Sequence, residues 1–159
     1  MQFVVRRLNP EDVPRLRQFW NEQWSGEFIV TRGTIHTPDQ VEGFVVEDAD
    51  DWAGLITYTI VDDECEVISL DALREREGIG TALLRRTIEE ARSRRCKRIF
   101  LITTNDNLYA FGFYQRRDFE LAAVYRGAVN ESRKIKPGIS GIGLNHIPLR
   151  DEIELEMIL

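Results

Sequence analysis

The chain lacks most features of secreted, membrane-spanning or metal-binding proteins. Its 159 residues include only two cysteines and two histidines, and no apolar run approaches the roughly 18 residues of a membrane-spanning helix. Residues 1–5 already resemble a strand, so we expect no cleaved signal peptide. Cys65 and Cys96 lie in or beside apolar runs, which favours reduced core thiols over a disulfide. We therefore expect a cytoplasmic protein that has no membrane partner and binds no metal.

A basic surface is also missing. The formal net charge is −6, whereas nucleic-acid-binding proteins need Lys and Arg to replace the counterions of the phosphate backbone. We therefore expect no nucleic-acid partner. The apolar share of 43% and charged share of 30% are typical of a soluble folded protein. The length suits a single domain with its own core, spanning residues 1–159.

Hydrophobic periodicity and turn residues predict alternating strands and helices. Expected strands are 3–7, 43–47, 53–61, 64–70, 98–103, 119–125 and 152–159. Expected helices are 10–22, 80–95, 107–117 and 128–135, while 23–37 is expected to be a loop or a short helix. We expect a mixed α/β (α+β) fold, with helices on both faces of a mostly antiparallel sheet of about seven strands and a central βαβ unit.

The last expected strand shows the alternation typical of a half-buried strand. Ile153, Leu155 and Met157 are expected to face inward. The intervening residues Glu152, Glu154 and Glu156 are expected to face outward. Because a closing strand can leave an open sheet edge, 152–159 is a candidate edge for a homodimer.

The run Gly78-Ile79-Gly80-Thr81 joins a predicted strand to a predicted helix. Two glycines let the backbone approach a ligand closely, and the first amides of a helix attract phosphate. A dinucleotide-binding loop would carry a third glycine where Leu83 stands, and a P-loop would carry a lysine before Thr81. Taken alone, the run is either an anion site or simply a flexible helix start.

The segment from Asn107 to Phe119 resembles the second signature of the GNAT superfamily of acyl-CoA N-acyltransferases, which reads Asn-x-x-Ala-x-x-Phe-Tyr-x-x-x-Gly-Phe. It matches at Asn107, Ala110, Phe113, Tyr114 and Phe119. Residues 75–80 resemble the first signature, Gln/Arg-x-x-Gly-x-Gly/Ala, and the order of predicted elements is also similar to that family. Only 131–150 has no counterpart in the general pattern.

Two residues depart from the family pattern. Glu75 stands where the family has Gln or Arg, so backbone amides and Arg76 are expected to hold the pyrophosphate. Asp118 replaces a glycine at the end of a helix. Because Asp tolerates the left-handed conformation better than most residues, we expect this turn to survive.

The resemblance implies acetyl-CoA as co-substrate and a set of residues that hold it. It implies that strand 64–70 splays away from strand 98–103, and that the amide of Leu70 faces the thioester oxygen. The implied cofactor-binding residues are Ile68, Leu70, Arg76, Glu77, Gly78, Ile79, Gly80, Thr81, Asn107 and Tyr114. Asn107 could equally serve only as a helix N-cap.

Acetyl transfer to an amine needs a general acid and a general base. The resemblance implies that Tyr114 donates a proton to the departing thiolate, although it could be only a buried aromatic. Glu64 and Glu66 lie on one face of the strand leading to the site. Either carboxylate could serve as the base, and either could instead belong to a solvated face.

The acceptor is expected to be an amine of a small molecule or peptide. Trp24, His36 and Arg133 are the candidate residues that contact it. His36 could instead be a structural histidine, and Arg133 could instead belong to a solvated face. We expect an N-acetyltransferase that works by direct transfer; the alternative is a non-catalytic acyl-CoA-binding or sensory module with the same fold.

Overall fold

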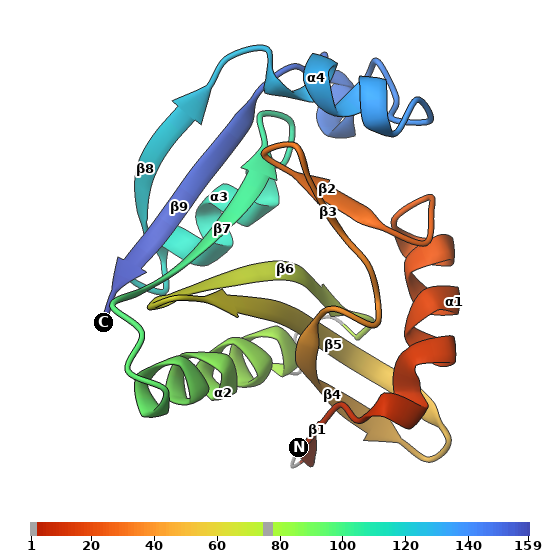
Figure 1. Cartoon of the computed structure of the whole chain (residues 1–159), viewed down its shortest axis with the longest axis vertical. Coiled ribbons are helices and arrows are strands. Elements are labelled where there is room, and N and C mark those ends of the chain that lie inside the picture. Colours follow the sequence, from red (N-terminus) through yellow and green to blue (C-terminus); the bar gives the residue numbers. More distant parts are fainter. Residues whose placement is uncertain (1–2, 75–77) are drawn as a thin grey trace.

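The computed structural model describes residues 3–74 and 78–159, which form a seven-stranded sheet with helices on both faces (Figure 1). The sheet strands are β1 (Val5–Arg7), β4 (Glu42–Asp48), β5 (Asp51–Val61), β6 (Glu64–Ala72), β7 (Arg98–Thr104), β8 (Glu120–Tyr125) and β9 (Glu152–Ile158). The helices are α1 (Val13–Gln23), α2 (Ile79–Ser93), α3 (Leu108–Gln115) and α4 (Ala128–Ile135). The strand order is β1-β4-β5-β6-β7-β9-β8, and among these described strands only β6 and β7 pair in parallel. The predicted fold class is confirmed.

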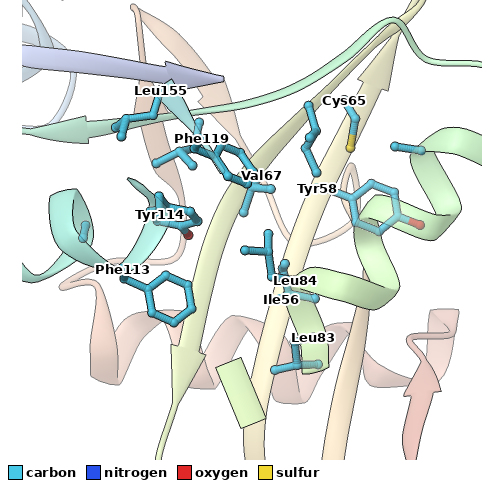
Figure 2. Packing of buried hydrophobic residues seen from close by; sticks show 14 of the residues in the cluster. Ile56, Tyr58, Cys65, Val67, Leu83, Leu84, Phe113, Tyr114, Phe119 and Leu155 are labelled. Atoms are coloured by element: carbon cyan, nitrogen blue, oxygen red, sulfur yellow. The ribbon is translucent and has the colours of Figure 1, made fainter. Parts of the chain in front are cut away.

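Alternating residues of the central strands build a core on each face of the sheet. Val45 and Leu55 pack in the cluster of α1, while Phe44 and Ile56 pack in the cluster of α2 and α3, part of which Figure 2 shows. At Gly54 a Cβ atom would lie 2.3 Å from a methyl carbon of α2. Glycine therefore lets the first turn of α2 lie directly on β5.

Strands β6 and β7 pair along only part of their length. Their register runs from Glu64↔Arg98 to Val67↔Leu101, and beyond it the strands diverge (Figure 1). The register of β6 with β5 also shifts here, so that Ile68 has no partner on either neighbouring strand. The predicted splay is confirmed, and it opens the sheet above the start of α2.

Residues 23–37 differ from the expected loop or short helix. They contain a separate hairpin of β2 (Ile29–Thr31) and β3 (Thr34–His36). Arg32 and Gly33 connect the strands with φ of 48° and 77°, and two positive φ values are typical of the tight turns that suit hairpins. Strands of three residues are too short to show an alternating pattern.

The predictions for β9 were partly wrong. Glu152 and Glu154 are only 4% and 9% exposed, because β9 lies inside the sheet and the side chains of Arg32, Arg98 and Tyr125 cover this face. Among the described strands the sheet ends at β1 and β8, so 152–159 offers no open edge for a second copy.

Two smaller features follow from sequence. Asp118 has φ of 71°, and the amide of Phe119 donates a 3.1 Å hydrogen bond to the carbonyl of Tyr114, so the predicted turn is confirmed. The two cysteines are buried and unpaired. In the described part of the chain, no helix combines the length and apolar character needed to span a bilayer.

Candidate functional site

A cleft of about 730 Å³ lies where β6 and β7 diverge, between the start of α2 and helix α3. Eight of the ten predicted cofactor-binding residues line it: Ile68, Leu70, Gly78, Ile79, Gly80, Thr81, Asn107 and Tyr114. The other two, Arg76 and Glu77, lie outside the described residues, as does Glu75. Trp24 also lines the cleft, whereas His36 and Arg133 do not.

The two glycines of the helix start have different physical roles. Gly78 is the N-cap of α2 with φ of 76°, a conformation that most side chains disfavour. At Gly80 a Cβ atom would lie 3.4 Å from the ring of Phe113, an ordinary van der Waals contact, so α2 packs closely on α3 here without requiring glycine. The first amides of α2 have no partner within the helix, and residues 78–81 all line the cleft. This arrangement suits an anion.

Arg117 adds a cation at this helix start and was not predicted. Its guanidinium donates hydrogen bonds of 3.1 and 2.9 Å to Thr81 Oγ1 and one of 2.8 Å to the carbonyl of Phe113. It also lies 3.7 Å above the centre of the Phe113 ring. Nothing in the spacing from 81 to 117 indicates this contact, which depends on the packing of α3 against α2.

Tyr114 is almost fully buried at the wall of the cleft, with 6% of its surface exposed. Its ring lies 5.1 Å from that of Phe113 and 5.3 Å from that of Phe119, centre to centre (Figure 2). Burial, and then the charge of Asp71, raise the pKa of Tyr114. The phenol is therefore protonated at neutral pH, and no described side chain or backbone group forms a hydrogen bond with its hydroxyl.

Asp71 is a second residue that sequence reasoning missed. It lies near the end of β6 and lines the same cleft as Tyr114. Its Oδ2 accepts a 3.0 Å hydrogen bond from Nε1 of Trp24. Burial raises the pKa of Asp71, and the indole hydrogen bond opposes that shift. The cleft thus carries a carboxylate on the side where Trp24 closes it.

Glu64 and Glu66 lie on the same face of β6, as predicted, but their surroundings differ. Glu64 forms an ion pair with Arg98. Burial, together with the nearby carboxylates of Glu154 and Glu152, raises the pKa of Glu66 to about 7. A carboxyl group with this pKa can exchange a proton near neutral pH, so Glu66 fits a general base better than Glu64.

His36 is buried behind Glu66. It is 6% exposed, and its Nε2 lies 2.7 Å from the hydroxyl oxygen of Thr31. The same hydroxyl donates a 2.8 Å hydrogen bond to Oε2 of Glu66. Burial lowers the pKa of His36, so its ring is neutral at pH 7. His36 is therefore linked to Glu66 through the hydroxyl of Thr31.

Asn107 and Arg133 hold local structure. Asn107 is the N-cap of α3, where its Oδ1 accepts a 3.1 Å hydrogen bond from the amide of Ala110. Arg133 donates to the carbonyls of Ile139, Ser140 and Leu149 and so holds the loop after α4. Among the described residues, no group of three or more His, Cys, Asp or Glu side chains is placed to hold a metal ion.

Comparisons with known proteins agree with this geometry. The chain is 42% identical to the protein YxbD of Bacillus subtilis over 147 residues, which are 92% of this chain and 91% of that protein. It is 41% identical to YdhI of the same organism over 145 residues, 91% of each chain.

A solved structure of a GNAT family acetyltransferase from Elizabethkingia anophelis, with acetyl-CoA bound, has the same fold. The TM-score is 0.73 at 18% identity, and the match covers 99% of this chain and 98% of that one. The sequence profile of the acetyltransferase (GNAT) family matches residues 6–119. The chain therefore belongs to the acetyltransferase (GNAT) family, and it is an acetyl-CoA-dependent acetyltransferase.

Proposed function

We propose that the protein moves the acetyl group of acetyl-CoA directly to an amine of a small molecule or peptide. One observation carries the proposal: the divergence of β6 and β7 places the anion-binding start of α2 and the buried Tyr114 on one cleft. The acetyl-CoA bound to the similar Elizabethkingia anophelis structure supports this use of the cleft.

The backbone of residues 78–81 would hold the pyrophosphate of the cofactor through the first amides of α2. Arg117, already bonded to Thr81, would add positive charge there. The resemblance of residues 75–80 to the first signature makes Arg76 and Glu77 further candidates to bind the pyrophosphate. Asn107 lines the cleft on the opposite wall, where the pantetheine arm is proposed to lie.

The amides of Ile68 and Leu70 are the candidates to polarise the thioester carbonyl. Ile68 is the extra residue of the bulge and pairs with neither neighbouring strand, so its backbone groups are available to a ligand. A donor aimed at the developing oxyanion stabilises the tetrahedral intermediate of acyl transfer. Leu70, two residues further on, also lines the cleft.

Two side chains would move the protons. Glu66 takes a proton from the acceptor ammonium, directly or through water, and the neutral nitrogen then attacks the thioester carbonyl. When the C–S bond breaks, Tyr114 gives its phenolic proton to the thiolate. The attacking nitrogen loses its second proton to the Tyr114 phenolate, directly or through water, and Glu66 releases its proton to solvent. Glu64, paired with Arg98, is the less suitable base.

The acceptor is proposed to enter between Trp24 and the hairpin that carries His36. Asp71 lines the cleft, and Glu66 lies outside its lining but on the same strand, bonded to the hairpin; these two carboxylates favour a cationic amine. Arg133 would act here only indirectly, through the loop it holds. A cytoplasmic location and a homodimer remain predictions.

A panel of amines and short peptides tests the function. Acetyl-CoA should raise the melting temperature, and at least one amine should release free thiol and yield an N-acetyl product detected by mass spectrometry. Stabilisation by acetyl-CoA with no thiol release from any amine would favour the non-catalytic acyl-CoA-binding module. Stabilisation by ATP or NAD in place of acetyl-CoA would contradict the assignment of the cleft.

A further inference from the structure

We infer that Thr31 and His36 are positioning residues for Glu66, which hold one carboxylate oxygen and leave the other to accept the proton of the acceptor amine. The inference rests on the proposed function, because it takes Glu66 as the general base. It assigns a role to a buried histidine and threonine that acetyl transfer, as outlined above, does not use.

The geometry begins with the β2–β3 hairpin. Thr31 and His36 lie on opposite strands, and both side chains point away from solvent, with 6% of each residue exposed. Ile29, which pairs directly with His36, packs in the core cluster of α1 and anchors the hairpin to the sheet. The two polar side chains are thereby held against β6, where Thr31 meets Glu66.

The hydrogens available on each group determine which atom donates in the two hydrogen bonds that link His36, Thr31 and Glu66. A threonine hydroxyl has one hydrogen, and Thr31 donates it to Oε2 of Glu66 over 2.8 Å. When Glu66 is ionised, the 2.7 Å contact between Thr31 and His36 is then a donation from His36 Nε2 to the hydroxyl oxygen. His36 is therefore the neutral tautomer protonated at Nε2, and both donors point toward the carboxylate.

The hydrogen bond from Thr31 favours the ionised form of Glu66, whereas most other influences favour the neutral form. Burial favours the neutral carboxyl, and Glu154 and Glu152 of β9 face Glu66 and favour it too. The hydrogen bond from Thr31 is the largest influence that favours the carboxylate, ahead of Arg98 on β7. Without it, less of Glu66 would be ionised at neutral pH, and less base would be available.

The hydrogen bond from Thr31 also determines which oxygen of Glu66 is free to accept a proton. No described residue forms a hydrogen bond with Oε1 of Glu66, whereas Oε2 is occupied by Thr31. In the proposed step the N–H bond of the ammonium breaks and an Oε1–H bond forms, while the Thr31 proton stays on its hydroxyl. Glu66 is only partly buried but does not line the cleft, so a water molecule would carry the proton from the acceptor to Oε1.

The pH dependence of kcat/KM tests the inference with matched variants. Thr31→Val removes the hydroxyl, Thr31→Ser keeps it, and Thr34→Val alters an exposed threonine of the same hairpin as a control. A hydrogen bond to a charged group contributes about 1.5–3 kcal/mol. In Thr31→Val the acidic limb of the kcat/KM profile should therefore shift to higher pH by about one to two units. Thr31→Ser and Thr34→Val should leave the limb in place.

Carbon-13 NMR titration of the Glu66 carboxyl supplies a measurement that needs no substrate. Its pKa should rise in Thr31→Val and stay near the wild-type value in Thr31→Ser. His36→Gln keeps a donor near the place of Nε2, whereas His36→Leu removes it, so only the second should raise the Glu66 pKa. In the wild type, nitrogen-15 NMR should show His36 protonated at Nε2.

The outcomes distinguish the positioning role of Thr31 and His36 from the role of Glu66 as the base. If Thr31→Val lowers the rate equally at every pH and leaves the Glu66 pKa unchanged, the positioning role is wrong while Glu66 can remain the base. If Thr31→Val does not fold, the Glu66 pKa is measured in His36→Leu instead, and an unchanged value there would contradict the positioning role. If Glu66→Gln keeps the wild-type rate and acidic limb, the base assignment itself is wrong.

Discussion

The indole nitrogen of Trp24 donates a 3.0 Å hydrogen bond to Oδ2 of Asp71 and so joins the end of α1 to the end of β6. Both residues line the cleft, and the charge of Asp71 is felt by Tyr114, whose pKa it raises. A side chain predicted to contact the acceptor thus orients a carboxylate next to the proposed general acid.

Trp24→Phe tests this pair because it removes the donor and keeps an aromatic ring. A hydrogen bond to a carboxylate contributes about 1.5–3 kcal/mol, so kcat/KM for the acceptor amine should fall about tenfold or more. Kd for acetyl-CoA, measured by calorimetry, should change little. Trp24 is 37% exposed, so its loss should not unfold the protein. An unchanged kcat/KM would separate Trp24 and Asp71 from acceptor binding.

Tyr114→Phe should lower kcat about 10²-fold or more, the usual contribution of a general acid, with little change in KM. Its raised pKa keeps the phenol protonated through neutral pH, so Tyr114 should cause no fall in rate below pH 9. Tyr58→Phe is the matched control, because Tyr58 is a buried tyrosine that does not line the cleft. Steady-state kinetics with thiol detection decides; equal kcat values for wild type and Tyr114→Phe would rule out this acid.

Glu66→Gln should lose activity and gain stability. Burial raises the pKa of Glu66 in the folded protein to about 7, from an ordinary value near 4.5. The folded state therefore favours the neutral carboxyl, and the stability of the wild type falls as pH rises from about 5 through 7. Above pH 7 the variant should be more stable by about 1–2 kcal/mol, less than the full pKa shift implies because the side chain is partly exposed.

Urea unfolding at pH 5 and pH 8 measures this effect for Glu66→Gln. The gain should be present at pH 8 and nearly absent at pH 5, when the wild-type carboxyl is protonated. Glu64→Gln is the control, because it removes one partner of the ion pair with Arg98 and should give no gain. Equal stability of wild type and Glu66→Gln at both values would show that Glu66 is not held in an unfavourable charged state.

Arg117→Gln should weaken the binding of coenzyme A about tenfold, as expected for a charged hydrogen-bonding group lost from an anion site. Its contacts with Thr81 Oγ1 keep it at the first turn of α2. Arg116→Gln changes an adjacent arginine that does not line the cleft. Calorimetric titration with coenzyme A compares them, and equal losses in both variants would indicate only a general effect of positive charge.

Local sequence was sufficient for the long elements. Strand 64–70 and helix 80–95 show clear periodicity over many residues, and the structure has them as β6 and α2. The left-handed turn at Asp118 also followed from the end of a helix and the residue type found there. The β2–β3 hairpin did not, since its strands of three residues lack a repeating pattern.

The sequence by itself determined the family resemblance, the order of elements and the set of residues at the helix start and on α3, because these depend on short-range spacing. Only the tertiary structure decided what each carboxylate does. Glu64 and Glu66 are equivalent in the pattern of β6, yet one forms an ion pair with Arg98 and the other meets Thr31. Such differences arise from strands and helices that are distant in the chain, whose charges and burial set the pKa of a side chain.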